Sequence, residues 1–475
     1  MNKYTFKRLQ NKLQKNGVKI ERYNSNIIHV ESLNTYGLKS KILLPENFNI
    51  EEKAINQLLD FSNIAHPDGG HVKCSCATPD FHSGTDIPVG SIVVTDHSMV
   101  IPQAIGTDIN CGMRLHKIDL TYDKFLSNKS TWIEKLKGDL LGSTRNIPVT
   151  PYSMSALFNE GMGAFFDEIK NKKEGLFKKI DFSIIQKELS KLHLSAFEKG
   201  NSMYAPDSLQ NISRDLIRDP SLATLGGGNH FCELQVVTEI IDKKKAYLNG
   251  LKVGQLVLMI HSGSRDVGIY VGNRWKDKAK QAWSKKIKYP DNKIFPIYGD
   301  LANEYMLAMH SASHYANLNR ALIAEIVRQR TIEVFGDIDC SLIVDVPHNI
   351  ILKEEIGNVH RKGATPAHKD QNLLIPGSMG HDSYFLNGLG NNDWIKSASH
   401  GAGRSISRTE ILFKSKNKKF DLGLKNIECI TLNEDRLIEE CPSAYKDIGP
   451  VIRSQVEEKV IDVIAKFSPI LTFKS

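Results

Sequence analysis

An uninterrupted apolar run, Gln255-Leu-Val-Leu-Met-Ile260, passes directly into a polar turn, His261-Ser-Gly-Ser-Arg265. A short apolar run that lacks a helical period and ends at turn residues is typical of a strand buried in a sheet. The runs Ser91 to Val94 and Ser341 to Val346 have the same character. Each run ends beside polar residues, which is where a rigid scaffold presents functional side chains. The sequence therefore predicts buried strands that carry a functional site at their ends.

Two other segments have helical spacing. Asp181 to Phe197 lies within a Lys-rich stretch, about 125–215, which we expect to be a helical insertion. In Ala302 to Val334, Leu318, Leu322 and Ile326 recur every four residues along one face. Strands and helices do not alternate in a regular βαβ rhythm, so we expect an α+β fold of mixed sheets with surrounding helices. Neither a repeat nor a linker divides the chain, which predicts a single domain over residues 1–475.

The composition is that of a globular protein, with 41% hydrophobic and 24% charged residues. The apolar runs are too short to span a bilayer, and the N-terminus lacks the apolar core of a signal peptide. Seven scattered cysteines favour a reducing compartment over a disulfide scaffold, so we expect a cytoplasmic protein without a membrane partner. A net charge of +8 is compatible with a polyanionic partner without requiring one.

Four histidines lie where ordered strands meet loops. A neighbouring glycine lets the backbone approach a ligand closely, and exposed N–H groups can then hold phosphate oxygens. The four segments are Gly228-Asn229-His230-Phe231, His261-Ser262-Gly263-Ser264-Arg265, Pro347-His348-Asn349 and His400-Gly401-Ala402-Gly403-Arg404.

A fifth element, Asp108-Ile109-Asn110-Cys111-Gly112, supplies two further ligand types three residues apart. Carboxylate oxygen, thiolate sulfur and imidazole nitrogen together suit a divalent transition metal, and a thiolate can bridge two ions. A single histidine at a strand end is more often structural than a ligand, and one Asp-x-x-Cys pair indicates little. The joint occurrence of all five elements predicts a metal site.

Other candidate motifs are incomplete. His310 and His314 have the spacing of a helical metal pair but lack the glutamate of H-E-x-x-H, so a packed or surface helix accounts for them. Cys74 and Cys76 lack a matching second pair for a zinc knuckle. The sequence contains no Walker-type phosphate loop, which argues against an ordinary P-loop nucleotidase.

The five elements above resemble, in order, the motifs of RtcB RNA ligases. The same resemblance extends from about residue 65 to the C-terminus, apart from the helical stretch. Its further motifs are His360-Arg-Lys-Gly-Ala-Thr365, Ile375-Pro-Gly-Ser-Met-Gly380, Ala444-Tyr445-Lys446 and Lys474.

The resemblance implies a GTP- and manganese-dependent enzyme that joins an RNA 3′-phosphate or 2′,3′-cyclic phosphate to a 5′-hydroxyl. The RNA would be a tRNA or another structured RNA, in splicing or repair, and the need for an activating protein stays open. His400 would be the nucleophile that becomes guanylylated before the RNA 3′-end receives the guanylyl group. One Mn²⁺ would be held by Cys111, His261 and His348, and a second by Asp108, Cys111 and His230.

The remaining implied roles concern nucleotide and RNA. Asn229 and Asn349 would contact phosphate, together with the Gly401-Ala402-Gly403 turn. Glu233 would accept the guanine N–H groups, which discriminates bases more strongly than packing does. Tyr445 would stack on the base, Ser378, Ser383 and Lys474 would surround it, and Arg265 and Arg404 would bind RNA phosphates.

The chain also departs from the family pattern. Pro366 and Asp266 replace an arginine and a glycine, His381-Asp382 replaces small residues, and the chain ends in Lys474-Ser475. Neither Arg214 nor Arg218 aligns with an arginine that the family uses upstream of the glycine run. These departures put the identity of the RNA in doubt and leave the chemistry intact.

Two other functions use the same residues. A two-metal phosphodiesterase or phosphatase would need the cluster but not His400, Tyr445 or Lys474. A non-catalytic RNA-binding protein would be expected to have lost ligands, and all of them are present. The ligase is the reading that accounts for every motif.

Overall fold

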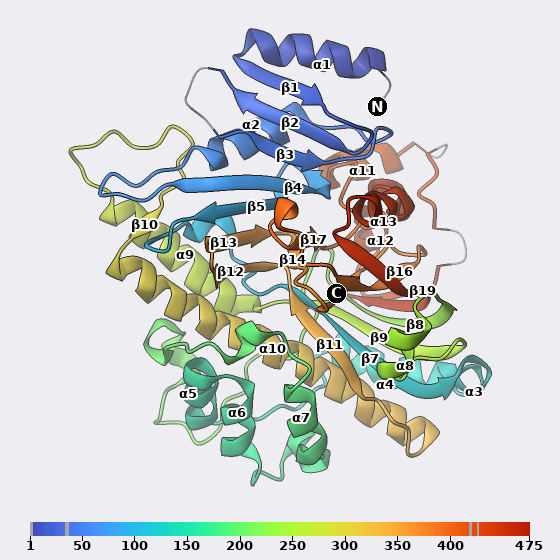
Figure 1. Cartoon of the computed structure of the whole chain (residues 1–475). Coiled ribbons are helices and arrows are strands. Elements are labelled where there is room, and N and C mark those ends of the chain that lie inside the picture. Colours follow the sequence, from blue (N-terminus) through green and yellow to red (C-terminus); the bar gives the residue numbers. More distant parts are fainter. Residues whose placement is uncertain (1–2, 34–37, 418–419, 425–426) are drawn as a thin grey trace.

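The computed structural model describes residues 3–33, 38–417, 420–424 and 427–475, and two large sheets dominate it (Figure 1). Within these residues the first sheet is seven-stranded, in the order β1-β2-β3-β4-β5-β13-β12. Its strands are β1 (Val18–Arg22), β2 (Ile27–Ser32), β3 (Ser40–Leu43), β4 (Val72–His82), β5 (Val89–Thr95), β12 (Asn349–Glu354) and β13 (Gly357–Lys362).

The second sheet runs in the order β11-β7-β9-β8-β19-β16-β15, and β18 pairs with β19. Every residue of β9 is buried, which confirms the strand predicted from its apolar run. The strands are β7 (Gly112–Thr121), β8 (Phe231–Ile240), β9 (Gln255–Ser262), β11 (Leu342–Pro347), β15 (Asn372–Ile375), β16 (Ser383–Gly388), β18 (Cys429–Thr431) and β19 (Ile461–Lys474). Two small antiparallel pairs join β6 (Met99–Val100) to β10 (Ile297–Tyr298) and β14 (Ala364–Pro366) to β17 (Ser397–Ser399).

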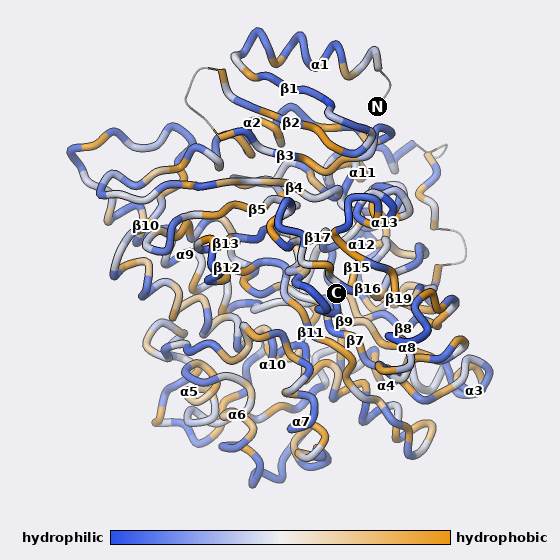
Figure 2. The backbone as a smooth tube through the Cα atoms, viewed as in Figure 1, coloured by the Kyte–Doolittle hydropathy of each residue, from blue (hydrophilic) through white to orange (hydrophobic). Residues whose placement is uncertain are grey.

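The longest helix, α10 (Asp300–Phe335), lies against β7 and β9 and packs on α9 (Arg265–Ala282). The helix predicted over Ala302 to Val334 is confirmed. Its burial extends beyond the face of Leu318, Leu322 and Ile326, because residues 308–328 are buried on every side between the second sheet and the helical segment. His310 and His314 are buried within it. Figure 2 shows hydrophobic residues gathered on the central strands, whereas the peripheral helix α1 (Lys3–Lys15) is mostly hydrophilic.

Residues 122–189 carry the helices of the segment that we expected to be inserted. The predicted helix over Asp181 to Phe197 is shorter, because α7 ends at Leu189 and a separate 3-10 turn covers Leu194–Phe197. That the segment is an insertion into one domain stays a prediction. Its helices are α3 (Tyr122–Leu126), α4 (Lys129–Leu140), α5 (Pro151–Glu160), α6 (Met162–Ile169) and α7 (Phe182–Leu189).

Further helices lie outside the two sheets, and the mixture of helices and sheets confirms the α+β class. Among the residues described, no helix has the length and apolar character needed to cross a bilayer. These helices are α2 (Glu52–Ser62), α8 (Lys243–Leu248), α11 (Arg408–Ser415), α12 (Asp435–Glu439) and α13 (Ile448–Glu457).

Candidate active site

Strand register in the second sheet brings the ligand-bearing segments to one edge. Gly112, at the start of β7, pairs with Ser262 at the end of β9 and with Pro347 at the end of β11. Phe231, at the start of β8, pairs with His261. Because neighbouring strands are antiparallel, the starts of β7 and β8 meet the ends of β9 and β11. Residues far apart in the sequence therefore share one edge.

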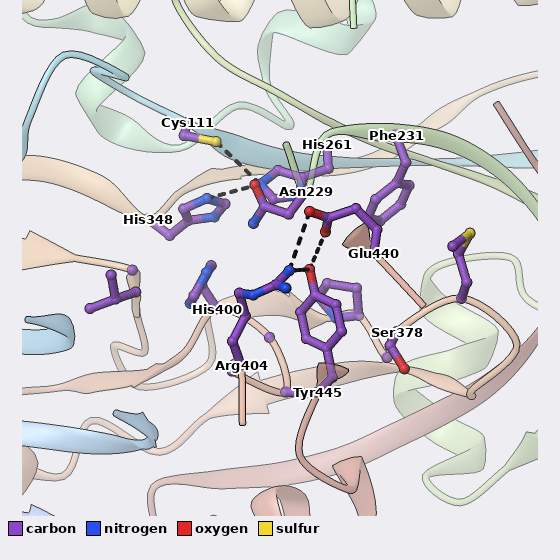
Figure 3. Close-up of a pocket in the computed structure, with 18 of the residues that line it drawn as sticks. Cys111, Asn229, Phe231, His261, His348, Ser378, His400, Arg404, Glu440 and Tyr445 are labelled. Atoms are coloured by element: carbon purple, nitrogen blue, oxygen red, sulfur yellow. Dashed lines mark hydrogen bonds and ion pairs between the residues drawn. The ribbon is translucent and has the colours of Figure 1, made fainter. Parts of the chain in front are cut away.

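Cys111 and three imidazoles form a cluster at this edge, part of which is drawn in Figure 3. The sulfur of Cys111 lies 3.2 Å from Nε2 of His230 and 3.1 Å from Nε2 of His261. The Nε2 atoms of His261 and His348 are 3.1 Å apart. The ligand atoms of Cys111, His261 and His348 all lie within 4.8 Å of one another, as do those of Asp108, Cys111 and His230. These are the two ligand sets expected from the sequence.

The donor chemistry of the cluster fits a divalent cation. Nδ1 of His230 lies 2.9 Å from the carbonyl oxygen of Leu225, and Nε2 lies 2.9 Å from a carboxylate oxygen of Asp108. The carbonyl can only accept, so Nδ1 carries the proton and the Nε2 lone pair points at an anionic oxygen and a sulfur. Converging lone pairs require a proton or a cation between them. The sulfur, nitrogen and oxygen donors suit a transition metal ion.

Burial sets the protonation states of the other ligands. It lowers the pKa of His261 and of His348 well below the ordinary value, which keeps both imidazoles neutral and able to ligate. It also raises the pKa of the Cys111 thiol, so binding of a metal ion would release that proton. Asp108 is held in place because its carbonyl accepts the side-chain N–H of Asn349 at 3.1 Å. A Cβ at Gly263 would lie 2.0 Å from the Asp108 carboxylate, so glycine is required there.

His400 follows β17 and lies beside the cluster, with its ring centroid 4.8 Å from that of His348. Its Nδ1 lies 2.6 Å from Oδ2 of Asp80, a fully buried residue of β4. Because a carboxylate can only accept, Nδ1 carries a proton, and in the neutral ring the lone pair therefore lies on Nε2. A Cβ at Gly403, where φ is +76°, would lie 2.3 Å from the carbonyl oxygen of Asp80. The glycine therefore lets the turn after His400 close over Asp80.

A cavity of about 320 Å³ opens beside the cluster and His400. Most of the residues expected to handle nucleotide line it. Ser383 is not among the lining residues. Its hydroxyl accepts the amide N–H of Gln235 at 2.9 Å, and Gln235 also donates to the lining residue Glu233. The expected lining residues are Asn229, Glu233, Asn349, Ser378, Gly401, Ala402, Gly403, Tyr445 and Lys474.

Glu233 is held in the cavity wall by hydrogen bonds from Gln235 and Thr472. Burial raises the pKa of its carboxyl group above the ordinary value. Elsewhere in the cavity wall, the hydroxyl of Ser378 is hydrogen-bonded to Nδ1 of His381 at 2.6 Å. His381, which departs from the family pattern, thus holds the lining residue Ser378 in place.

Glu440 organises another wall of the cavity, as Figure 3 shows. Its buried carboxylate accepts hydrogen bonds from the hydroxyl of Tyr445 and from Arg404. The Arg404 guanidinium also donates to the carbonyl of Glu439 at 2.9 Å and lies 5.1 Å from the Tyr445 ring centroid. Arg404 is therefore held in the cavity wall and orients Tyr445, and its predicted contact with RNA phosphates stays a prediction.

The other predicted RNA contact, Arg265, is not among the residues that line the cavity. Arg265 has a left-handed backbone, with φ of +49°, and its Nε donates to Thr224 at 2.9 Å. Asp266 is exposed in the first turn of α9, where a negative charge favours the helix N-terminus. Arg214 and Arg218 are both exposed and do not line the cavity.

The site predicted from the sequence did not include three residues that line the cavity or contact His400. They are Asp80, Lys362 and Glu440, all of which contact or line the cavity groups. Lys362 donates to the carbonyl of Ile105 at 3.0 Å, and burial lowers its pKa. Asp80 gave a usable signal, since it is a polar residue near the end of a buried strand. Its partner, however, lies 320 residues away.

Comparison with known proteins agrees with this geometry. The family model described as tRNA-splicing ligase RtcB matches residues 60–475. The chain belongs to the RtcB family. The RtcB family joins RNA ends in tRNA splicing and repair, so the predicted family and the class of nucleic-acid ligase are confirmed.

Curated RtcB proteins align with most of the chain. The tRNA-splicing ligase RtcB of Methanococcus maripaludis is 30% identical in an alignment that covers 89% of this chain and 91% of the relative. Those of Aeropyrum pernix and Thermococcus kodakarensis are also 30% identical, and they cover 90% and 84% of this chain and 94% and 87% of their own. The ligand-bearing segments all lie within the part that matches the RtcB model.

Proposed function

We propose that this RtcB protein joins an RNA 3′-phosphate or 2′,3′-cyclic phosphate to a 5′-hydroxyl, with GTP as co-substrate and two Mn²⁺ ions. The observation that carries the proposal is the position of His400, which lies beside the metal-ligand cluster with Nδ1 protonated by its contact with Asp80. A hydrolase would need the cluster alone. A histidine with a free Nε2 at the same cavity is what a guanylyl-transfer enzyme requires.

The first step would be attack of His400 Nε2 on the α-phosphorus of GTP. A nitrogen–phosphorus bond forms, the bond to the β-phosphate bridging oxygen breaks, and pyrophosphate leaves. Bound metal ions would neutralise charge on the phosphate oxygens. Asp80 would stabilise the positive charge that develops on the imidazole, as an orienting carboxylate does in other nucleophile–base pairs.

In the second step the RNA 3′-phosphate would attack the same phosphorus and release His400. The product is an activated RNA end whose leaving group is GMP, and the 5′-hydroxyl then displaces GMP to form the phosphodiester. A 2′,3′-cyclic phosphate would first be opened by water. Seven free cysteines support a reducing compartment, so we place this activity in the cytoplasm.

Labelling tests the nucleotide step directly. The protein is incubated with α-labelled GTP and Mn²⁺, denatured, and tested for bound label that acid removes and alkali does not. We expect label on the wild type and on His97→Ala, which changes an exposed histidine, and none on His400→Ala. Metal binding without any label on the wild type would contradict the proposal and favour a hydrolase.

End joining tests the RNA step. Oligonucleotides with 3′-phosphate and 5′-hydroxyl ends are mixed with the protein in the presence or absence of GTP and Mn²⁺. We expect joined product only with both, and much less when ATP replaces GTP. Joining that does not depend on nucleotide would rule out the guanylylated intermediate.

A further inference from the structure

Buried polar residues form a stripe on α10. Ser313, Asn317, Asn319 and Arg320 are almost fully enclosed, although a helix buried on all sides is expected to be apolar there. Buried polar groups are retained when their hydrogen bonds are satisfied, and these side chains satisfy theirs largely outside the helix. Their partners belong to the segments that carry the metal ligands.

The first partner is Asn110, which lies between Asp108 and Cys111 and has a left-handed backbone, with φ of +51°. Its side-chain Nδ2 donates to the hydroxyl of Ser313 at 2.5 Å and to Oδ1 of Asn317 at 3.1 Å. Asparagine adopts the left-handed region more readily than most other non-glycine residues, and these hydrogen bonds hold Asn110 there. The contacts from α10 thus fix the turn that aims both ligands at the cluster.

Arg320 ties the Asn110 turn to two further segments. Its guanidinium donates to the carbonyls of Asn110 at 2.7 Å and Ser262 at 3.0 Å, and to the carboxylate of Asp345 at 2.7 Å. Ser262 follows the ligand His261, and Asp345 precedes the ligand His348 by three residues on β11. The planar fork of arginine matches several acceptors at once, which lysine cannot do.

Asn319 extends the stripe to the loop before His230. Its amide donates to the carbonyls of Thr224 at 3.1 Å and Gly263 at 3.2 Å, and its oxygen accepts the N–H of Thr224 at 3.1 Å. Through Asn319 and Arg320, α10 contacts the segments that carry all five proposed ligands.

We infer that this stripe is a positioning set for the metal centre, with Arg320 as its main anchor. The inference rests on the proposed metal cluster. Groups that orient ligands without touching the ion commonly affect metal affinity by about 10- to 100-fold. Arg328, two turns further along α10, provides a matched control. It is also buried and pairs with Glu188 and Glu325. It donates to the carbonyl of Cys340 at 3.3 Å but does not contact Asn110, Ser262 or Asp345.

Arg320→Lys and Arg328→Lys are compared by calorimetric titration with Mn²⁺ and by thermal unfolding without metal. We expect Arg320→Lys to bind Mn²⁺ about 10- to 100-fold more weakly, with guanylylation partly rescued by raised Mn²⁺. Arg328→Lys should lose about as much thermal stability as Arg320→Lys and should bind Mn²⁺ with the affinity of the wild type. Equal affinity of Arg320→Lys and wild type, or equal weakening in both variants, would overturn the inference.

Ser313→Ala covers the case in which Arg320→Lys does not fold. Losing one hydrogen bond to Asn110 should weaken Mn²⁺ binding about 2- to 10-fold, and unchanged affinity would overturn the inference. If the wild-type protein itself binds no Mn²⁺, the proposed function fails and the inference fails with it. If the wild type binds and the variants match it, the inference alone fails.

Discussion

The carboxylate of Asp80 lies 2.6 Å from Nδ1 of His400 and also accepts the His400 main-chain N–H at 3.2 Å. Burial alone would raise the pKa of Asp80, but the His400 ring, a hydrogen bond from Thr78 and the nearby Lys446 hold it below its ordinary value. Asp80 thus stays ionised and accepts from Nδ1. The first sheet therefore orients the proposed nucleophile, while the second sheet supplies most of the metal ligands.

Asp80→Asn should slow guanylylation by about 10²- to 10⁴-fold, because an amide can donate to Nδ1 and favour the wrong imidazole tautomer. Single-turnover labelling with GTP measures the rate. Asp119→Asn, which changes an exposed carboxylate on β7, controls for the substitution itself. A rate within threefold of wild type would show that Asp80 does not set the tautomer.

Cys111→Ser should abolish tight Mn²⁺ binding, since a hydroxyl is a far poorer bridging ligand than a thiolate. Calorimetric titration with Mn²⁺ reports the loss directly. Cys76→Ser also places a hydroxyl at a buried cysteine, on β4 and away from the cluster, and should bind Mn²⁺ as the wild type does. Retention of both ions by Cys111→Ser would exclude the bridging role.

Glu233→Gln should reduce the preference for GTP. If the carboxylate accepts both guanine N–H groups, the wild type should use ITP, which lacks the 2-amino group, about tenfold less efficiently than GTP. The amide has one acceptor oxygen, so the variant should narrow this ratio, as measured by kcat/KM for guanylylation and inosylylation. Glu239→Gln, further along β8, serves as the control. An unchanged ratio would place base recognition elsewhere.

Glu333 links α10 to the helical segment through an ion pair with Lys179 at 2.9 Å, and it also pairs with Arg330 on α10 itself at 2.8 Å. Partial burial alone would raise its pKa, but hydrogen bonds from these two residues lower the pKa of Glu333 to about 2. Because the folded pKa is depressed, this stabilisation is fully present above the unfolded value of about 4.5 and is lost as pH falls towards 2.

Glu333→Gln should therefore lower the free energy of unfolding by roughly 1 kcal/mol at pH 7, with the difference shrinking below pH 4.5. Urea unfolding at pH 7, 5, 4 and 3 tests the trend. Glu168→Gln, on the exposed side of α6, should have little effect at any of these values. A difference that grows in acid would contradict the assigned ion pairs.

From the sequence, the proposed metal ligands and His400 were predicted as polar residues where strands meet loops, and the resemblance to RtcB motifs supplied their roles. The structure brings these side chains together, and their roles stay predictions. Each lies in a short local motif where a strand meets a turn, as His261 does at the end of the apolar run Gln255 to Ile260. The α+β class followed from the same local patterns. These features depend on residues that are neighbours along the chain, so they can be recognised in the sequence.

Only the tertiary structure decided which groups act on those residues. Asp80 reaches His400 because two strands of different sheets end at one cavity, and Arg320 reaches the ligand turns because a helix is buried against the second sheet. Arg404 was predicted from the sequence to contact RNA phosphates, and in the structure its guanidinium donates to the Glu440 carboxylate. Hydrogen bonds between distant segments depend on how the chain packs, and no local pattern of residue types encodes that packing.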